Sequence, residues 1–230
     1  MKAFILAGGV GSRLLPYTTN FPKPLMPIND KPILEIVIDR LRQAGIRDII
    51  LGTGHMAELL QAFFGDGKKF GVKINYSRED EPLGTAGPLN LVRGQFNETF
   101  LVMNGDILTD LDFQDFIAYH QQQQSVATVA MSQRTVDIDF GVVEFDDDNL
   151  FQKWSEKPVI EYMVSMGVYL FNPEIFEVLP AEGFFNLPDL IVKLAEKDKK
   201  VKGYRHPGYW LDIGRPSDYS KACEDYGNRL

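Results

Sequence analysis

Cysteine is nearly absent from this chain: Cys223 is the only one among 230 residues, so no disulfide can form within the chain. A single thiol is typical of a protein that works in a reducing compartment, and the sequence therefore predicts a cytoplasmic location. No histidine lies near Cys223 in the sequence to activate it, so we interpret it as a structural thiol rather than a nucleophile.

Long apolar runs are missing as well. The apolar run at the start, residues 1–6, meets glycines at once. It is shorter than the apolar region of a signal peptide, about 7–15 residues, and than a membrane span of about 20. We therefore expect neither a signal peptide nor a membrane partner.

The chain also lacks an excess of positive charge. The chain has 24 Lys and Arg against 32 Asp and Glu, a formal net charge of −8. Nucleic acid and anionic membranes are disfavoured as partners of so acidic a chain. If the ligand is nevertheless anionic, the positive groups must be gathered at one place or a cation must help.

Strands and helices alternate through the first half, and no linker or internal repeat divides the chain. Strands are expected at 2–6, 48–52, 72–76 and 100–103, and helices at 32–44, 58–64, 88–92 and 113–122. The second half is expected to hold strands at 126–131, 141–145, 151–154, 164–171, 201–204 and 209–211, with helices at 173–179, 187–197 and 216–226. Asp146-Asp147-Asp148-Asn149 is interpreted as a hairpin turn. This pattern predicts one Rossmann-like α/β domain with a mixed, mainly parallel central sheet.

The segment directly after the first strand is rich in glycine. Gly8, Gly9 and Gly11 let backbone N–H groups approach a phosphate without obstruction by side chains. Arg13 follows at once, and Lys23 stands between two prolines that stiffen its presentation. The pattern favours a triphosphate cradle over a tight surface turn.

Two well-known phosphate loops do not fit this segment. The dinucleotide pattern G-x-G-x-x-G fails because Leu14 or Arg13 stands where a glycine is required. The P-loop pattern fails because no Gly-Lys-Ser/Thr follows Gly8 or Gly9. A P-loop hydrolase is therefore disfavoured, and a nicotinamide-dependent oxidoreductase remains only as a weak alternative.

Two aspartates follow short apolar runs that are far apart in the sequence. Asp106 ends the run 100–106, and Asp212 ends the run 209–212. Ligands of open α/β sheets bind at the carboxyl ends of strands. Two carboxylates together with substrate phosphates are a usual environment for Mg²⁺, so we predict that Asp106 and Asp212 bind this metal. Taken alone, each aspartate is more readily explained as a turn residue, and it is the combination with the glycine loop that favours the metal.

The glycine segment resembles the nucleotide-binding motif of the sugar-1-phosphate nucleotidyltransferases, through 8–14, Pro16, Thr18 and 22–25. The resemblance extends from residue 2 to about residue 219 and implies a fold of the nucleotide-diphospho-sugar transferase type. It also implies that the catalytic residues are Arg13, Lys23, Asp106 and Asp212. The implied nucleotide-binding residues are Leu6, Ala7, Gly8, Gly9, Gly11, Ser12, Arg13, Lys23, Gly84, Thr85, Ala86, Asn104 and Gly105. Ser12 stands where threonine is usual in the family.

The sugar-phosphate end is implied by the same resemblance. The Glu-Lys-Pro motif at Glu156 and Lys157, the backbone of Gly141, and Ser165 would bind the sugar phosphate. Ser165 stands where the family has asparagine, which leaves the sugar open. The domain would span 1–230, with a nucleotide-binding half at 1–125 and a sugar-phosphate-binding half at 126–230. No hexapeptide-repeat domain is expected after it.

Gly84-Thr85-Ala86-Gly87 resembles the base-recognition loop of mannose-1-phosphate guanylyltransferases, although Thr85 could instead cap the helix that follows. The implied reaction joins GTP and mannose 1-phosphate, or a related sugar such as heptose, with Mg²⁺ as cofactor. Its product would be a GDP-sugar for cell-surface polysaccharide. Uridylyl or thymidylyl transfer to glucose, N-acetylglucosamine or N-acetylmuramate 1-phosphate stays open.

A non-catalytic nucleotide-sugar-binding regulatory subunit is the alternative from another functional class. The oligomeric state also stays open, a homo-oligomer included. The three histidines show no metal-ligand spacing and are interpreted as structural or surface residues: His55, His120 and His206.

Overall fold

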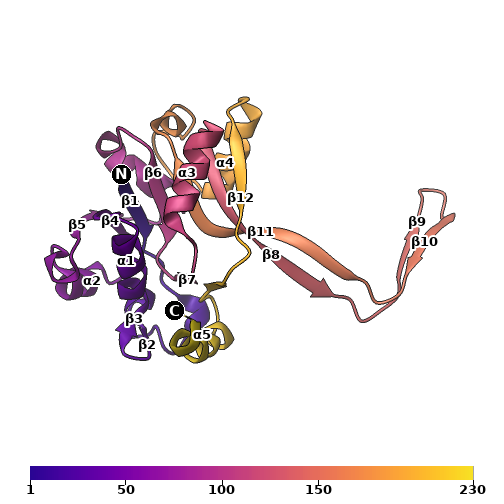
Figure 1. The fold of residues 1–230 in the computed structure, drawn as a ribbon, viewed down its shortest axis with the longest axis horizontal. Coiled ribbons are helices and arrows are strands. Elements are labelled where there is room, and N and C mark those ends of the chain that lie inside the picture. Colours follow the sequence, from indigo (N-terminus) through magenta and orange to yellow (C-terminus); the bar gives the residue numbers. More distant parts are fainter. Residues whose placement is uncertain (230) are drawn as a thin grey trace.

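A computed structural model describes residues 1–229, with side chains described through Tyr226. Its centre is a seven-stranded sheet in the order β12-β8-β11-β6-β1-β4-β5 (Figure 1). The strands in chain order are β1 (Lys2–Leu6), β4 (Asp48–Thr53), β5 (Lys73–Arg78), β6 (Phe100–Asn104), β8 (Ala127–Asp137), β11 (Val159–Phe171) and β12 (Val201–Arg205). Short two-stranded pairs are formed by β2 (Pro27–Ile28) with β3 (Lys31–Pro32) and by β7 (Ile107–Thr109) with β13 (Trp210–Asp212).

The direction of the strands confirms the mixed, mainly parallel sheet. β1 is parallel to β4 and β6, and β11 alone runs antiparallel to both of its neighbours, β6 and β8. β1 lies deep in the sheet, and its residues Ala3, Phe4 and Ile5 are fully buried. A continuous apolar run is what a strand covered on both faces requires.

Helices cover both faces of this sheet. α1 (Ile33–Gln43), α2 (Ala57–Phe64) and α3 (Phe113–Gln123) contribute to one apolar cluster. The 3-10 helices η4 (Gly87–Gln95) and η5 (Pro173–Glu177) and the helix α4 (Leu187–Glu196) contribute to the other. α5 (Pro216–Arg229) closes a third cluster with β2, β7 and β13. No helix within residues 1–229 is long and apolar enough to cross a membrane.

The two segments expected as helices near 88–92 and 173–179 are present as the 3-10 helices η4 and η5. Side chains tie η4 to the chain around η5: Asn90 Nδ2 donates to the carbonyl of Pro180 at 2.6 Å, and Arg93 Nη2 donates to that of Phe176 at 2.5 Å. These contacts with a neighbouring segment hold η4 in place.

The second half contains an arm that the sequence did not predict. β8 and β11 continue well beyond the expected 126–131 and 164–171, and their outer halves leave the body (Figure 1). The expected strands near 141–145 and 151–154 are present as β9 (Val142–Phe145) and β10 (Phe151–Ser155), but they pair only with each other. The hairpin turn between them is confirmed, because Asp146 Oδ1 accepts hydrogen bonds from the backbone N–H groups of Asp148 and Leu150. We call residues 133–164 the arm.

Candidate active site

The glycine loop follows β1 at the carboxyl edge of the sheet. Gly11 has φ 68°, and a Cβ there would lie 3.0 Å from Thr18 Cγ2, so a side chain would be both strained and crowded. Thr18 Oγ1 donates to the carbonyl of Gly11 at 2.9 Å and holds this conformation. A Cβ at Gly9 would meet nothing within 4 Å, so the backbone there is open to an approaching ligand.

Two short 3-10 helices place the basic residues of the site. η1 (Ser12–Leu14) is anchored by buried Leu14 and leaves Arg13 exposed. A Cβ at Gly214 would lie 3.5 Å from Arg13 Nη1, so the guanidinium lies against the loop after β13. η2 (Lys23–Leu25) buries Lys23, which is only 8% exposed and forms an ion pair with Asp106 Oδ2.

The pairing of β7 with β13 brings the two aspartates together. Asp212 is opposite Ile107, and the N–H of Ile213 donates to the carbonyl of Asp106 at 3.1 Å. The N–H of Gly105 donates to the carbonyl of Leu6 at 2.9 Å, which ties this turn to the end of β1. Residues more than a hundred positions apart thus meet beside the glycine loop.

The electrostatics of this cluster suit a cation. Burial, and secondly the charge of Asp106, raise the pKa of Asp212, while Lys23 and Arg13 act in the opposite direction. Asp106 Oδ1 is buried and has no hydrogen-bond partner among the described residues. A divalent ion would satisfy that oxygen and relieve the repulsion between the carboxylates. Residues 1–229 contain no cluster of three or more His, Cys, Asp or Glu side chains suited to a metal, so the remaining ligands would have to be phosphate or water oxygens.

Glu79 is a site residue that the sequence reasoning missed. It directly follows β5, and its Oε1 lies 2.7 Å from the position that a Cβ of Gly8 would occupy. The other carboxylate oxygen, Oε2, accepts from the N–H of Leu83 at 3.1 Å. Glu79 therefore connects the glycine loop to the loop that contains the Gly-Thr-Ala-Gly motif.

That second loop packs on the start of α4. Thr85 Oγ1 accepts from the N–H of Leu187 at 2.8 Å, so Thr85 caps α4 and not the helix that follows it in the chain. The alternative of a cap on η4 was wrong, because the Thr85 hydroxyl contacts a segment that is distant in the sequence. Gly84 has φ 79°, and a Cβ there would lie 2.5 Å from the carbonyl oxygen of Phe185. Only glycine allows the loop to approach α4 so closely.

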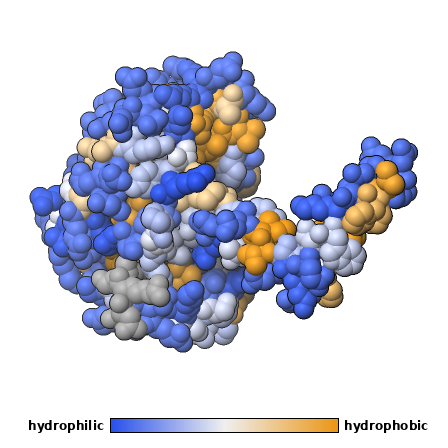
Figure 2. All heavy atoms as spheres, turned by 45° about the vertical axis from the view of Figure 1, so that its right-hand side comes forward, coloured by the Kyte–Doolittle hydropathy of each residue, from blue (hydrophilic) through white to orange (hydrophobic). Residues whose placement is uncertain are grey.

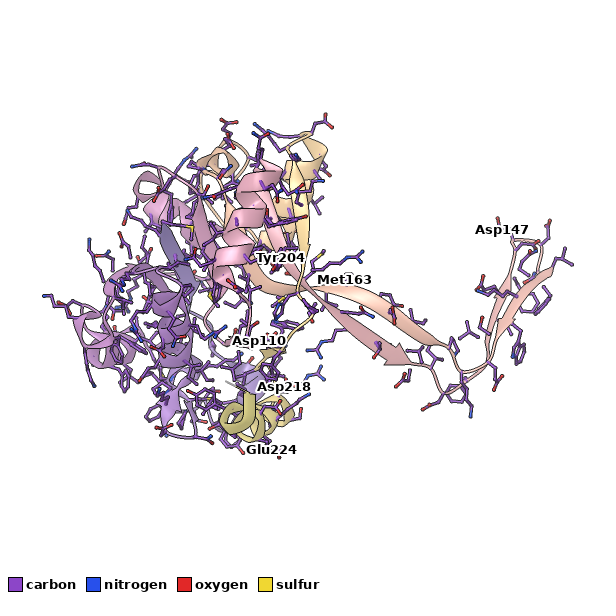
Figure 3. All side chains as sticks on the ribbon, in the orientation of Figure 1. Asp110, Asp147, Met163, Tyr204, Asp218 and Glu224 are labelled. Atoms are coloured by element: carbon purple, nitrogen blue, oxygen red, sulfur yellow. The ribbon has the colours of Figure 1, made fainter. Side chains whose placement is uncertain are left out.

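Three of the four predicted sugar-phosphate residues lie on the arm. Trp154 Nε1 donates to Glu156 Oε2 at 3.0 Å, and a Cβ at Gly141 would lie 2.5 Å from Trp154 Cζ2, so Gly141 and Glu156 share one neighbourhood with adjacent Lys157. This arm segment stands away from the body that carries the aspartates: Figure 3 shows Asp147 at the far end of the arm and Asp110 in the body.

Ser165 lies at the root of the arm and is closer to the nucleotide half. Its Oγ is 2.9 Å from Tyr169 Oη and accepts from the N–H of Gly167 at 3.2 Å. A Cβ at Gly167 would lie 2.6 Å from Asn104 Nδ2, so this turn contacts the end of β6. The structure thus connects Ser165, through Gly167, to the segment that ends in Asp106.

A cavity of about 820 Å³ opens at the root of the arm, two residues from Asp212 along β13. Its lining includes Trp210, Arg134 and His206. The Arg134 guanidinium lies 4.7 Å from the centroid of a Trp210 ring, so a positive charge stands at the cavity. We call this space the acceptor cavity. None of the predicted sugar-phosphate residues is part of its lining in the described structure.

The histidines differ in their surroundings. His120 is buried, with Nδ1 2.7 Å from Thr128 Oγ1 and Nε2 3.2 Å from Asn172 Oδ1, and burial lowers its pKa. This agrees with a structural role. His206 Nε2 is 2.8 Å from Asp110 Oδ1 at the edge of the acceptor cavity, and His55 is exposed.

A mixed sheet with a glycine loop, basic groups and two carboxylates at its carboxyl edge defines a nucleotide-binding α/β protein. The sequence model of the nucleotidyl transferase family matches residues 2–229, and the chain belongs to this family. It is 35% identical over 242 residues to a UTP–glucose-1-phosphate uridylyltransferase of Synechocystis sp., covering 96% of this chain and 62% of that protein. It is 34% identical to the mannose-1-phosphate guanylyltransferase catalytic subunit beta of Danio rerio, covering 95% and 62%.

The chain thus spans less than two thirds of the length of these curated relatives. Solved structures of similar proteins agree with the fold. A Bacillus anthracis protein assigned as a glucose-1-phosphate thymidylyltransferase superposes with a TM-score of 0.80 at 29% identity, covering 100% of this chain and 96% of the other. HddC from Yersinia pseudotuberculosis, complexed with GMP-PN, gives a TM-score of 0.76 at 28% identity, covering 98% and 99%.

Proposed function

We propose that this protein is a sugar-1-phosphate nucleotidyltransferase. The observation that carries the proposal is the meeting of Asp106, Asp212, Lys23 and Arg13 beside the open glycine loop. Four charged groups of this kind are far more than a structural turn needs, and they suit a substrate that brings several phosphates.

The reaction requires no general base. A phosphate oxygen of the sugar 1-phosphate is mostly ionised near neutral pH because its second pKa is about 6. This oxygen attacks the α-phosphorus of the nucleoside triphosphate, and the bond from that phosphorus to the oxygen bridging to the β-phosphate breaks. The electron pair leaves with pyrophosphate, and no proton has to move. The protein must align two polyanions and stabilise the developing charge.

Each site residue has a part in this alignment. The N–H groups of the glycine loop, with Ser12 beside them, and the Arg13 guanidinium would hold the triphosphate. Lys23, now paired with Asp106, would turn to the phosphates once a metal occupies the carboxylates. Asp106 and Asp212 would hold Mg²⁺, which supplies Lewis-acid stabilisation of phosphate charge when it is bound.

We propose guanine as the base. A carboxylate only accepts hydrogen bonds, and guanine offers two neighbouring donors, N1–H and the N2 amino group. Glu79 lies against Gly8 at the edge of the glycine loop, within reach of the Gly84-Thr85-Ala86 loop, and is placed to accept from both. The Danio rerio relative supports GTP with mannose 1-phosphate, and a related sugar such as heptose stays part of the proposal. The Synechocystis relative supports the alternative of uridylyl transfer to glucose 1-phosphate.

The proposal also covers the two halves of the chain, the compartment and the use of the product. Residues 1–125 would bind the nucleotide, and residues 126–230 would bind the sugar phosphate. The reaction would take place in the cytoplasm and supply nucleotide sugar for polysaccharide synthesis.

Pyrophosphate release tests the proposal directly. Four nucleoside triphosphates are to be crossed with the 1-phosphates of mannose, glucose, N-acetylglucosamine, N-acetylmuramate and heptose, with Mg²⁺ present. We expect release only when both substrates are present, and most of it with GTP. A protein that binds nucleotide sugar but releases pyrophosphate with no pair would instead be a non-catalytic regulatory subunit.

A further inference from the structure

The arm presents an apolar surface that its own chain leaves uncovered. Its large exposed side chains include Phe140, Phe145, Leu150, Phe151, Trp154 and Tyr162. Phe140 is 79% exposed, Leu150 66% and Trp154 60%. Figure 2 shows hydrophobic patches along the arm where it projects from the body. An isolated two-stranded ribbon is at best marginally stable in water, so a surface of this kind needs a partner.

The arm also holds groups that the acceptor cavity lacks. Glu156 and Lys157 lie between β10 and β11, while the lining of the cavity beside Asp212 includes neither of them. In each copy of the chain, Glu156 and Lys157 therefore lie outside the acceptor cavity.

The arm projects from its own body in the described structure (Figure 1). β8 and β11 pair in two runs, Ala127 to Val129 with Tyr169 to Phe171 in the central sheet and Met131 to Asp137 with Val159 to Ser165 along the arm. A register shift between Ser165 and Tyr169 separates the two runs. A paired ribbon that projects in this way suits contact with another molecule.

We propose that two copies of this chain exchange their arms, so that Glu156 and Lys157 of each copy complete the acceptor cavity of the other. The proposal rests on the proposed function for the role of these two residues. A two-fold arrangement makes the exchange reciprocal and closes the assembly as a dimer. A specific interface uses roughly 20–30 residues a side, which residues 133–164 can supply.

The body offers a receiving surface next to the site. The glycine loop and the segment that follows it expose four apolar side chains, each between 54% and 59% accessible: Val10, Leu15, Tyr17 and Phe21. The apolar face of a partner's arm would cover them. The arm has eight carboxylates and three basic side chains, so nucleic acid or an anionic membrane is a poor occupant by comparison.

The mass in solution is the first test. We expect light scattering to give twice the 26.1 kDa of one chain at micromolar concentration. Phe145 and Phe151 contact each other at 6.0 Å on the far part of the arm, and the double variant Phe145→Ser/Phe151→Ser should shift the protein toward the monomer. Phe184→Ser, which removes a 65% exposed ring outside the arm, is the matched control and should leave the dimer intact. A monomeric wild-type protein would overturn the proposal.

A complementation experiment then tests whether the arm serves its own body or the other copy. Asp106→Asn and Lys157→Ala are each expected to lower turnover in their own homodimers. Co-expression with two different tags gives a mixed dimer. With exchanged arms, one of its two sites combines an intact Asp106 with an intact Lys157, so about half of the wild-type activity should return. If each arm served its own body, neither site would be intact, and an inactive mixed dimer would contradict the exchange.

A crosslink tests the arm exchange independently of the proposed function. A photoreactive residue at position 156 is expected to link to residues 206–210 of the other copy in dimers of one isotopically labelled and one unlabelled chain. This readout needs no turnover, so it decides the arm exchange even if every substrate pair is inactive. Links confined to the same copy would refute the exchange and leave the nucleotidyltransferase proposal standing.

Discussion

Asp106 has two tasks at the residue scale: it pairs with Lys23 through one oxygen and leaves the other oxygen buried without a partner. Asp106→Asn keeps the shape of the side chain but removes the charge that a metal and Lys23 both need. We expect pyrophosphate release to fall by about 100-fold or more, in the range seen when one electrostatic contact to a transition state is removed. The far-UV circular dichroism should be unchanged, because the backbone carbonyl of Asp106 still accepts from Ile213.

Asp39→Asn is the control for this change. Asp39 forms an exposed ion pair with Arg42 on α1, away from the glycine loop, and its variant should keep full activity. Full activity of Asp106→Asn itself would rule out the metal assignment.

Glu79 is the residue that we propose selects the base. Glu79→Gln replaces one acceptor oxygen by a donor, and a bidentate contact to guanine is worth about 1–3 kcal/mol. We therefore expect the preference for GTP over UTP, measured as the ratio of kcat/KM values, to fall by roughly 5–150-fold. Glu81→Gln, in the same loop, should leave that ratio unchanged. An unchanged ratio in Glu79→Gln would remove the carboxylate from base recognition.

The sequence predicted some of these residues and not others. Asp106 and Asp212 were predicted to share a site because each ends an apolar run, but the antiparallel β7–β13 pair that brings them together was not predicted. Glu79 could not be predicted, since Asp80 and Glu81 follow it and nothing in the local pattern says which carboxylate lies against Gly8. The hydrogen bond from the N–H of Leu187 to Thr85 Oγ1 joins segments about a hundred residues apart, and no local sequence pattern predicts it.

At the scale of the element, α3 is fixed to β8 through a buried histidine. The His120 ring forms hydrogen bonds with Thr128 Oγ1 and Asn172 Oδ1, and burial lowers the pKa of His120 in the folded protein. Above the unfolded-state pKa of about 6.5 the histidine is neutral in both states and adds no pH dependence. As the pH falls below that value, the unfolded chain takes up the proton more readily, so stability is lost until the lower pKa of the folded state is reached.

Urea unfolding at a series of pH values measures this loss. The free energy of unfolding should decrease by up to about 1.4 kcal/mol per pH unit below pH 6.5 through this one group. The slope should shrink in His120→Gln and remain in His55→Gln, where an exposed histidine is replaced. Equal slopes in the wild type and His120→Gln would show that burial of His120 does not govern the acid response.

Elements with a strong apolar period were predicted well. Leu34, Val37, Ile38 and Leu41 recur at helical spacing, and α1 buries all four. The arm escaped prediction for a physical reason: β propensity says that a segment is extended, but not which strand it will pair with. The outer part of β8 has mostly exposed side chains, so no buried face in the sequence marks it as part of the ladder.

At the scale of the whole molecule, the proposed nucleotide site and the proposed sugar site are built differently. The first is built within one chain at the carboxyl edge of the central sheet. The second is divided between the acceptor cavity and an arm that points away from it (Figure 3). The sequence does not predict this division, because it contains no information on whether a strand pair serves its own chain or a partner.

The measurement that tests the central claim most directly is the position of a bound metal. Mn²⁺ can replace Mg²⁺ and be located by anomalous scattering in crystals grown with a non-hydrolysable GTP analogue. We predict one ion bound by carboxylate oxygens of both Asp106 and Asp212 and by phosphate oxygens of the nucleotide. A nucleotide seated on the glycine loop with its metal bound by neither aspartate would contradict the account.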